Sequence, residues 1–236
     1  MYGWRGKIGI IIPSANTTME PELNKMAPNG VTIHCSRMFA MGCGTEDLKR
    51  QDEDVESCAR LLGSADMDVI IYGCTSGSFV NGLGWERQLQ ECIAREAQCK
   101  SITTTGAVLK ALSVFGKKYL TLVNPYNDEV SGIEHNFFAS QGYYITGGAH
   151  LGFDQGVDIR SQVPEQTYRL AKKAVTKETE ILFISCTNFR TIEVLEELEK
   201  DLGIPVISSN QASLWEALNV IGVREKITGY GSLFQQ

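Results

Sequence analysis

The chain reads VIIYGCTS at residues 69–76 and ILFISCTN at residues 181–188. Each stretch begins with four apolar residues, typical of a buried strand. In each, a small residue, a cysteine, a threonine and a polar residue follow in that order. The two cysteines are Cys74 and Cys186. A cysteine at the end of two such similar runs is the first indication that the sequence contains a repeat.

Two further matches support an internal repeat. Pro13 and Pro125 each end an apolar run, and their separation along the chain equals that of the two cysteines. TTT at residues 103–105 matches SSN at residues 208–210, each before a similar helical pattern, at a slightly shorter spacing that a short loop change explains. Three matches in the same order along the chain indicate duplication, and duplicated halves commonly pack about a pseudo-twofold axis.

Helical patterns separate the apolar runs. In residues 46–62 the apolar positions recur at helix spacing, with charged residues on the other face. The predicted strands are residues 7–12, 68–72, 119–123, 181–185 and 205–207, and the predicted helices lie near residues 85–98, 106–115, 128–140, 164–177, 189–201 and 211–221. Strands that alternate with helices indicate parallel sheets with helices on their faces.

We therefore predict an α/β fold of two pseudo-twofold-related lobes, each a parallel sheet flanked by helices. The first lobe is predicted to comprise residues 1–103 plus 216–236, and the second residues 104–215. Ligands of open α/β sheets bind beyond the carboxyl ends of the strands. Equivalent strand ends from the two lobes are therefore expected to face one cleft.

The composition limits the possible partners. The 236 residues are 43% hydrophobic and 21% charged, which is ordinary for a globular protein, and the formal net charge is −6. This acidic balance gives no electrostatic reason to expect nucleic acid or an anionic membrane as a partner. No apolar stretch approaches a membrane span, and the N-terminus lacks the layout of a signal peptide, so a cytoplasmic protein is expected.

The seven cysteines include no CxxC pair, so reduced thiols are expected rather than a disulfide framework. The three histidines, His34, His135 and His150, have no metal-ligand spacing, and no metal site is predicted. Five of the cysteines are interpreted as small buried hydrophobic residues: Cys35, Cys43, Cys58, Cys92 and Cys99.

Cys74 and Cys186 are interpreted as functional because each directly follows a predicted strand. The loop after such a strand offers free backbone N–H groups, which favour a thiolate and also hold a carboxylate or a developing enediolate. A thiol on each side of a bound molecule can act as nucleophile and acid, or as base and acid. The sequence therefore predicts a two-thiol site for a small carboxylate substrate.

The loop PSANTTMEPE after the first strand, residues 13–22, supplies a further candidate. The Asn16 amide can donate to a carboxylate without adding charge, whereas Thr17 and Glu20 have the spacing of a capping box that only starts a helix. In the second half Tyr126 occupies the matching loop, directly after Pro125, and its hydroxyl can donate in the same way.

These residues also carry a family resemblance. IIPSANTTMEPE at 11–22, GCTSGSF at 73–79 and SCTN at 185–188 closely resemble the maleate cis-trans isomerase and arylmalonate decarboxylase branch of the aspartate/glutamate racemase superfamily. The resemblance covers essentially the whole chain. Decarboxylases of this branch have glycine in place of the first cysteine, and the amino-acid racemases carry a different opening after the first strand. Because both Cys74 and Cys186 are present, the chain resembles the isomerases more.

The resemblance implies that Cys74 is the nucleophile that adds to the substrate double bond and gives a succinyl-thioether intermediate. It implies that Cys186 donates the proton to the neighbouring carbon and takes it back. Rotation about the resulting single bond and loss of Cys74 would then convert maleate to fumarate with no metal, flavin or nicotinamide cofactor. The positions that match carboxylate-binding residues are Asn16, Thr75, Ser76, Tyr126, Thr187 and Asn188.

One loop departs from the family pattern. Isomerases of the family often place another carboxylate-binding asparagine before the helix that begins near Pro164, and GFDQGVDI at residues 152–159 contains none. Gln155 can substitute, whereas Asp154 and Asp158 would repel a dicarboxylate if they pointed inward. The expected substrate is therefore maleate or a related small unsaturated dicarboxylate.

Two alternatives remain open from the sequence. The first is a racemase or decarboxylase that acts on another small carboxylic acid with the same two cysteines. The second is a non-catalytic protein whose cleft only binds a carboxylate. Nucleotide binding is disfavoured because no GxxxxGK[ST] motif is present and GGAHLG at residues 147–152 lacks GxGxxG spacing. A homodimer is the expected assembly for a cytosolic enzyme.

Overall fold

The computed structural model describes residues 2–40 and 42–236, with the side chains of residues 49, 51 and 83 left aside. Its described residues form two four-stranded parallel sheets, in the order β2-β1-β3-β4 and β6-β5-β7-β8. The strands are β1 (Gly6–Pro13), β2 (Val31–Met38), β3 (Val69–Tyr72), β4 (Lys100–Thr103), β5 (Tyr119–Tyr126), β6 (Tyr144–Phe153), β7 (Ile181–Ile184) and β8 (Val206–Ser208). The predicted α/β fold with two parallel sheets is confirmed.

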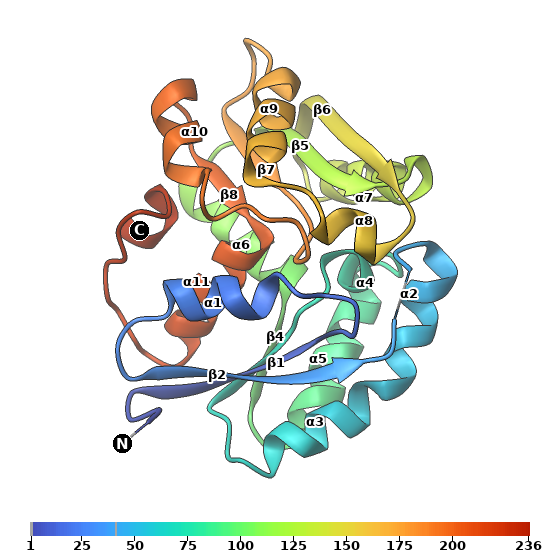
Figure 1. Cartoon of the computed structure of the whole chain (residues 1–236), viewed down its shortest axis with the longest axis vertical. Coiled ribbons are helices and arrows are strands. Elements are labelled where there is room, and N and C mark those ends of the chain that lie inside the picture. Colours follow the sequence, from blue (N-terminus) through green and yellow to red (C-terminus); the bar gives the residue numbers. More distant parts are fainter. Residues whose placement is uncertain (1, 41) are drawn as a thin grey trace.

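The helices connect and cover these strands (Figure 1). In the first half they are α1 (Met19–Met26), α2 (Thr45–Gln51), α3 (Val55–Gly63), α4 (Thr75–Phe79), α5 (Leu83–Ala97) and α6 (Thr104–Phe115). In the second half they are α7 (Asp128–Ser140), α8 (Gly156–Arg160), α9 (Pro164–Ala174), α10 (Leu195–Leu202) and α11 (Ser209–Val220), with short 3₁₀ helices at Asp52–Asp54 and Ser232–Gln235.

The second sheet repeats the first in strand order and in register. Ile8 of β1 pairs with Val69 of β3, and Leu120 of β5 pairs with Ile181 of β7. The number of residues from Ile8 to Leu120 equals the number from Val69 to Ile181. The same number separates Cys74 from Cys186. The central strands are fully buried, because helices cover both faces of each sheet and their Ile, Leu, Val and Phe side chains form the core. The register therefore supports the duplication inferred from the sequence.

Helices α6 and α11 follow equivalent strands and pack against each other between the sheets (Figure 1). Both start with a hydroxyl cap, because Thr103 accepts from the N–H of Gly106 and Ser208 accepts from that of Gln211. The Ser213 hydroxyl then donates to the Thr104 hydroxyl across the helix pair at 3.2 Å. This contact joins the halves through the third of the repeated motifs.

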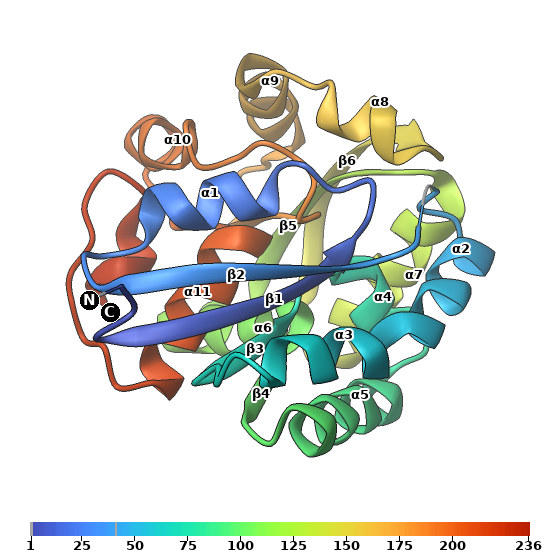
Figure 2. The same cartoon turned by 60° about the horizontal axis from the view of Figure 1, so that its bottom comes forward.

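Both chain termini lie on the same side of the molecule, at the left of Figures 1 and 2, and they are well separated in Figure 1. After α11 the chain passes Arg5, which pairs with Glu225, and Ser232 then hydrogen-bonds Glu199 of α10 at 2.7 Å. The C-terminal segment thus contacts both halves. The lobe limits, residues 1–103 with 216–236 and residues 104–215, stay a prediction.

Two of the predicted helices have different bounds in the structure because of tertiary hydrogen bonds. The helix predicted at 46–62 is divided into α2 and α3 at Asp52–Asp54, where Asp52 accepts from the Tyr72 hydroxyl and Asp54 accepts from the backbone of Phe39. The helix predicted at 189–201 begins only at Leu195, because the carboxylate of Glu22 takes up the backbone N–H groups just before it. Tertiary hydrogen bonds therefore override the local helical pattern in both places.

Candidate active site

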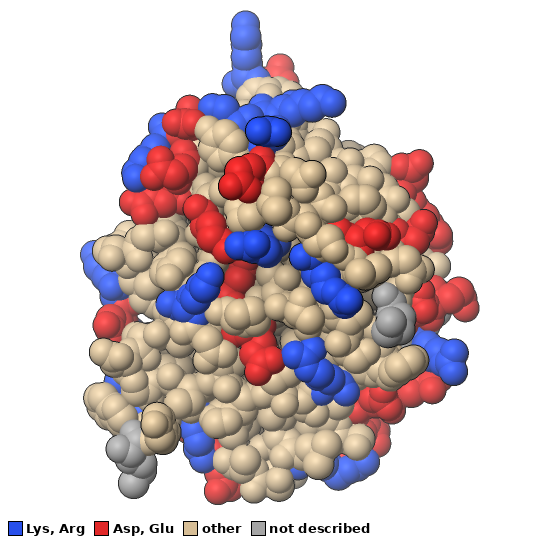
Figure 3. Space-filling model, viewed as in Figure 1, with Lys and Arg blue, Asp and Glu red and all other residues tan. Residues whose placement is uncertain are grey.

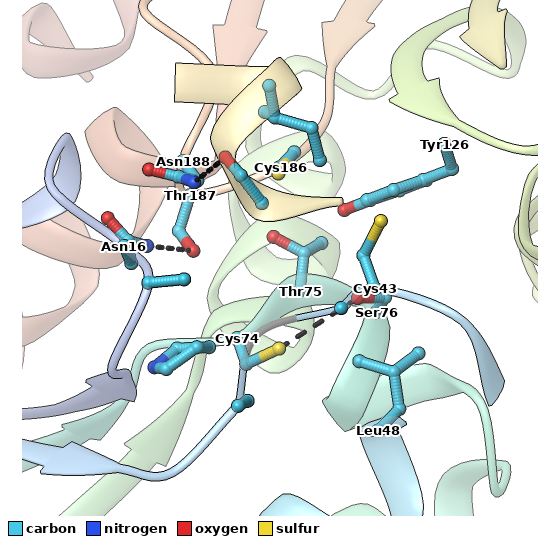
Figure 4. Close-up of a pocket in the computed structure, with 16 residues that line it drawn as sticks. Asn16, Cys43, Leu48, Cys74, Thr75, Ser76, Tyr126, Cys186, Thr187 and Asn188 are labelled. Carbon is cyan, nitrogen blue, oxygen red and sulfur yellow. Dashed lines mark hydrogen bonds between the residues drawn. The ribbon is translucent and has the colours of Figure 1, made fainter. Parts of the chain in front are cut away.

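A pocket lies where the carboxyl ends of β1, β3, β5 and β7 meet, and encloses ≈ 430 Å³ including its open mouth. All eight residues singled out from the sequence line it: Asn16, Cys74, Thr75, Ser76, Tyr126, Cys186, Thr187 and Asn188. Figure 4 shows Cys74 and Cys186 on the lower and upper sides of this space, with Tyr126 pointing in from the second half. The structure thus brings both thiols into one pocket, as the repeat predicted.

Cys74 begins helix α4 directly after Gly73, and its side chain is 5% exposed. Its backbone is extended, with φ −137°, and its Sγ accepts from the N–H of Gly77 at 3.4 Å. The Ser76 hydroxyl lies 3.8 Å from the same sulfur. Donation from a backbone N–H at a helix start stabilises a thiolate, which is the nucleophilic form of cysteine.

Cys186 occupies the equivalent position after β7, but its backbone lies in the left-handed region, with φ 91°. Its N–H donates to the Ser209 hydroxyl at 3.1 Å. Burial raises the pKa of the Cys186 thiol far above its usual range, and the neighbouring Cys43 and Cys74 raise it further, against hydrogen bonds from the Asn188 backbone and the Tyr126 hydroxyl. Cys186 is therefore a protonated thiol at neutral pH, suited to donate a proton.

Asn16 links the two halves at the floor of the pocket. Its Oδ1 accepts from the N–H groups of Thr18 and Met19 at 2.9 and 3.0 Å, and its Nδ2 donates to the Thr187 hydroxyl at 2.9 Å. The capping box predicted for Thr17 and Glu20 is wrong, because Asn16 caps the helix and Glu20 pairs with Arg37. Asn16 thus lines the pocket, and it also holds the start of α1.

Thr187 and Asn188 continue this network between the halves. The Thr187 hydroxyl donates to the carbonyl of Gly73 at 3.0 Å, directly before Cys74. Asn188 accepts from the N–H of Thr17 at 3.1 Å and donates to the carbonyl of Gly156 at 3.0 Å. These hydrogen bonds fix the polar side chains in place and use the Thr187 hydroxyl proton and one N–H of each amide, so the second N–H of Asn16 and of Asn188 has no partner among the described residues and is left for a carboxylate.

The remaining predicted side chains are also held. Thr75 donates from its hydroxyl to the Ser209 hydroxyl at 2.9 Å, close to the backbone of Cys186. The Tyr126 ring is 1% exposed, and its hydroxyl lies 3.4 Å from that of Ser185. Burial raises the pKa of Tyr126 well above its ordinary value, as do the nearby Cys186 and Glu134. Tyr126 therefore stays a neutral hydrogen-bond donor.

The outer wall of the pocket is largely apolar and includes Cys43, which the sequence analysis interpreted as structural. The Cys43 backbone N–H donates to the carbonyl of Asp154 at 2.9 Å, and its thiol donates to the carbonyl of Phe153 at 3.2 Å. Burial raises the pKa of Cys43 to about 12, and Asp154 and Cys74 add to the effect. Cys43 is therefore a neutral thiol that joins the two halves at the pocket mouth.

No motif in the sequence marked this contact, but the repeat does. Gln155 is the counterpart of Cys43 at the spacing that separates the two catalytic candidates, and Gly42 forms an antiparallel bridge with Gln155. Equivalent segments of the two halves thus meet across the pocket, as a pseudo-twofold arrangement requires. The rest of this wall is formed by Ala40, Leu48, Gly156 and Ile159.

The loop at residues 152–159 does not introduce negative charge into the pocket. Asp154, Gln155 and Asp158 are exposed, and the Asp154 carboxylate accepts from the Asn127 amide at 2.6 Å. Gln155 is absent from the described lining, so it does not substitute for the missing asparagine. The residues that this loop contributes are the neutral Gly156 and Ile159.

The charge distribution outside the pocket is mixed. Figure 3 shows lysine and arginine interspersed with aspartate and glutamate on the face that it presents. Within residues 2–40 and 42–236, no group of three or more His, Cys, Asp or Glu side chains could hold a metal ion. None of the helices described there has the length and apolar content needed to cross a bilayer.

Two parallel α/β sheets, whose matching strand ends each bring a cysteine to a shared pocket of hydroxyl and amide groups, define an α/β protein with a two-thiol pocket suited to a small acid. Residues 8–234 match the family model described as arylmalonate decarboxylase. The chain belongs to that family.

Similar proteins within this family carry two names. A maleate isomerase of Pseudomonas putida is 27% identical over 96% of each chain, and an arylmalonate decarboxylase of Bordetella bronchiseptica is 28% identical over 97% of this chain and 96% of its own. Among solved structures, a mutant maleate cis-trans isomerase of Nocardia farcinica with a covalently bound succinylcysteine intermediate superposes with a TM-score of 0.92 over 98% of both chains, at 22% identity. This last likeness confirms the fold.

Proposed function

We propose that the protein is a cofactor-independent cis-trans isomerase that converts maleate, or a related small unsaturated dicarboxylate, to fumarate by transient addition of a cysteine. One observation carries the proposal. Two thiols at equivalent strand ends line one pocket; the Cys74 sulfur accepts from a backbone N–H, which favours its thiolate, and burial keeps Cys186 a neutral thiol. The relatives named maleate isomerase support the same reaction.

The first half of the reaction breaks the double bond. The Cys74 thiolate adds to one alkene carbon and forms a C–S bond, while the Cys186 thiol gives its proton to the neighbouring carbon. The product of this step is a succinyl thioether on Cys74 and a thiolate on Cys186. The succinylcysteine intermediate in the Nocardia farcinica isomerase has the same composition.

The second half restores the double bond after rotation about the new single bond. The Cys186 thiolate takes a proton back from the carbon that received it, and the C–S electrons return to Cys74 as fumarate forms. Atoms and charge balance with no oxidant or reductant. The buried hydroxyl of Tyr126 and the Asn188 backbone N–H, which both lower the pKa of Cys186, stabilise its thiolate while it exists.

The substrate carboxylates are assigned to the neutral donors of the pocket. The residues proposed to bind them are Asn16, Thr75, Ser76, Tyr126, Thr187 and Asn188. No lysine or arginine is among the described lining residues, so an anion is held by hydroxyl and amide dipoles alone. The seven cysteines are present as thiols, which fits a reducing compartment, and the cytoplasm and a homodimer stay part of the proposal.

A decarboxylase acting on a substituted malonate is the second candidate. The apolar wall of Ala40, Leu48 and Ile159 favours it, because such a wall suits an alkyl or aryl substituent rather than a second carboxylate. The family model and the 28% identical decarboxylase agree with this alternative. Against it stands Cys74, since the resemblance places glycine at that position in the decarboxylases.

The deciding experiment incubates the purified protein separately with maleate and with phenylmalonate and follows both by proton NMR. The proposal expects fumarate from maleate and no carbon dioxide release from phenylmalonate. Phenylacetate as the only product would replace the isomerase with the decarboxylase. Tight binding of maleate without turnover in the wild type would instead indicate a carboxylate-binding protein.

A further inference from the structure

Glu134 of α7 is a fully buried carboxyl group behind the pocket, and the proposed reaction does not use it. Its Oε2 accepts from the Asn124 amide at 2.8 Å, whereas its Oε1 has no hydrogen-bond partner among the described residues. An ionised carboxylate with so little support is costly to bury. The neutral acid is less costly, and its O–H needs an acceptor nearby.

Glu22 provides an internal comparison, because it is the counterpart of Glu134 at the repeat spacing and is equally buried, at 3% exposure. Its carboxylate accepts from the N–H groups of Thr191 and Ile192 at 2.8 and 3.4 Å and from the Asn210 amide at 2.7 Å. Glu22 is thus fully engaged as a clamp between the halves. The equivalent Glu134 lacks such a set of donors, so a clamp does not account for it.

A line of hydroxyl groups connects Glu134 to the pocket. Ser185, which directly precedes Cys186, faces the Glu134 carboxyl closely enough to lower its pKa by hydrogen bonding. The Ser185 hydroxyl lies 3.4 Å from that of Tyr126, and Tyr126 hydrogen-bonds Cys186. Asn124 holds the other side of this line, since it accepts from the N–H of Tyr126 at 3.1 Å. None of Glu134, Ser185 and Tyr126 is more than 1% exposed.

Each hydroxyl in this line has one proton, so the direction of donation is set at its buried end. A neutral Glu134 donates to Ser185, Ser185 donates to Tyr126, and Tyr126 is left to donate into the pocket. An ionised Glu134 accepts from Ser185, which in turn accepts from Tyr126, and the tyrosine proton then points away from Cys186. We propose that Glu134 is a positioning residue whose proton makes Tyr126 donate to Cys186 and the substrate; its catalytic consequence rests on the proposed function.

Glu134 ionises near neutral pH, so the direction of donation along the line changes within an accessible pH range. Burial raises the pKa of Glu134 to about 7, opposed by the nearby Ser185 hydroxyl and by the hydrogen bond from the Asn124 amide. Below that pH Glu134 is a neutral acid. Above it Glu134 is a carboxylate, and the O–H of Tyr126 turns away from Cys186 toward Ser185. The elements packed against α7 are β5, β6 and α4, and their other titratable groups are Tyr119, Tyr126, Tyr144 and His150. On α7 itself Asp128, Glu129 and His135 lie toward solvent or the groove outside the sheet.

The test uses Glu134→Gln in the full-length protein. The glutamine amide has the shape of the neutral acid, because its oxygen accepts from Asn124 and its NH₂ donates to Ser185 at every pH. The matched control is Glu129→Gln, an exposed carboxylate on the same helix. The measurement is the rate of Cys186 alkylation by iodoacetamide, followed by peptide mass spectrometry between about pH 5.5 and about pH 9, where model thiols begin to ionise.

The proposal expects the three proteins to react equally near pH 6. Toward pH 8.5 Glu134→Gln should alkylate at Cys186 about tenfold faster than the wild type, because only the variant still stabilises the Cys186 thiolate through Tyr126. A constant ratio across the pH range overturns the proposal, as does a Glu129→Gln protein that behaves like Glu134→Gln. Ser185→Ala interrupts the line of hydroxyl groups at a second point. In this variant the rate of Cys186 alkylation should no longer change near pH 7. A pH profile identical to that of the wild type also overturns the proposal.

Turnover of maleate is followed in parallel to separate the two proposals. The wild type should lose kcat/KM above pH 7, and Glu134→Gln should retain it. If no protein forms fumarate but the alkylation profiles differ as expected, the isomerase proposal fails and the Glu134 assignment stands. If fumarate forms with identical profiles in wild type and Glu134→Gln, the opposite holds.

Discussion

The turns that carry Cys74 and Cys186 come from one repeated sequence, yet they hold their sulfur atoms in different ways. The Cys74 turn has extended backbone and leads directly into α4, so the sulfur accepts from the N–H of Gly77. The Cys186 turn has left-handed backbone at the cysteine, and the next helix begins only at Leu195. The two cysteines occupy the same position in the repeat, but they differ in their surroundings. Cys74 stands at the start of a helix, whereas Cys186 is a buried thiol with no helix start beside it.

This difference shows how a duplicated unit acquires two chemical roles. An anionic sulfur needs donors, and Cys74 has a backbone N–H aimed at it. A proton donor needs a group that resists ionisation, and burial raises the pKa of Cys186 for that purpose. The fold supplies two thiols by repetition, and the local backbone favours the roles proposed for them, Cys74 as nucleophile and Cys186 as acid.

Replacing each cysteine by serine is the most direct way to break the comparison, and it should have the largest effect. Cys74→Ser should lower maleate turnover by about 10⁴-fold or more, because the covalent step is lost. Cys186→Ser should lower it by about 10²–10⁴-fold, the range for loss of a general acid. Turnover is measured by the NMR assay, and intact mass should show a maleate adduct in Cys186→Ser and none in Cys74→Ser. An adduct that forms only in Cys74→Ser would exchange the two roles.

The repeat explains why so much of the site could be predicted from the sequence. Cys74, Thr75, Cys186 and Thr187 sit beside strands whose apolar residues are fully buried, and the strand ends fix where these side chains go. Strands β2, β4 and β6 were not predicted, because each lies at the edge of a sheet and mixes polar or glycine residues with apolar ones.

The remaining features depend on contacts between distant parts of the chain. Cys43 reaches the pocket only because its loop pairs with residues 153–155 of the other half. Glu134 stands at helix spacing from Val130, Phe137 and Phe138, so the pattern puts it on the buried face of α7 but does not show what its carboxyl contacts. The repeat pairs each position with a counterpart, Gln155 or Glu22, but the contacts that each makes come from the three-dimensional structure.

The pair Glu22 and Glu134 sharpens the comparison of the halves through stability. Glu22→Gln should lower the free energy of unfolding by about 1–3 kcal/mol, because the amide turns a donor toward a donor of Asn210 or of the Thr191 backbone. Glu134→Gln should cost little at pH 5, since it resembles the neutral acid. Urea unfolding monitored by circular dichroism measures both, and equal losses in the two variants would remove the distinction between clamp and positioning residue.

Burial raises the pKa of both glutamates to about 7, so the pH dependence of stability has the same sign for each, and comparing wild type with Glu134→Gln isolates the part due to Glu134. The folded-state pKa of Glu134, about 7, lies above the ordinary value of 4.5, so its contribution to stability is complete below pH 4.5 and is lost as the pH rises through 7. Wild type should therefore lose stability relative to Glu134→Gln between pH 5 and pH 8, by about 3 kcal/mol at most. A difference that stays constant with pH would contradict the assignment of a neutral buried acid.

The backbone at the two turns can be compared by glycine substitution, with a smaller effect. Glycine adopts positive φ without the steric cost that a side chain meets, so Cys186→Gly should be more stable than Cys186→Ala by about 1–2 kcal/mol. At Cys74, with φ −137°, the preference for glycine over alanine should be smaller. Chemical denaturation of the four variants gives the two differences, and equal values would show that the left-handed turn at Cys186 is not strained.

Cys43 gives the smallest expected effect and tests whether the two-thiol description is complete. Cys43→Ala removes the hydrogen bond to the Phe153 carbonyl at the pocket mouth but none of the proposed reacting atoms. KM for maleate should rise about two- to fivefold, equivalent to the loss of one modest hydrogen bond, with kcat nearly unchanged. Cys35→Ala, at a half-buried thiol outside the pocket lining, is the matched control. A loss of kcat as large as that of Cys186→Ser would make Cys43 a third reacting thiol, and because residue 43 has Gln155 as its counterpart, the chemistry would then depend on a feature that the repeat does not share.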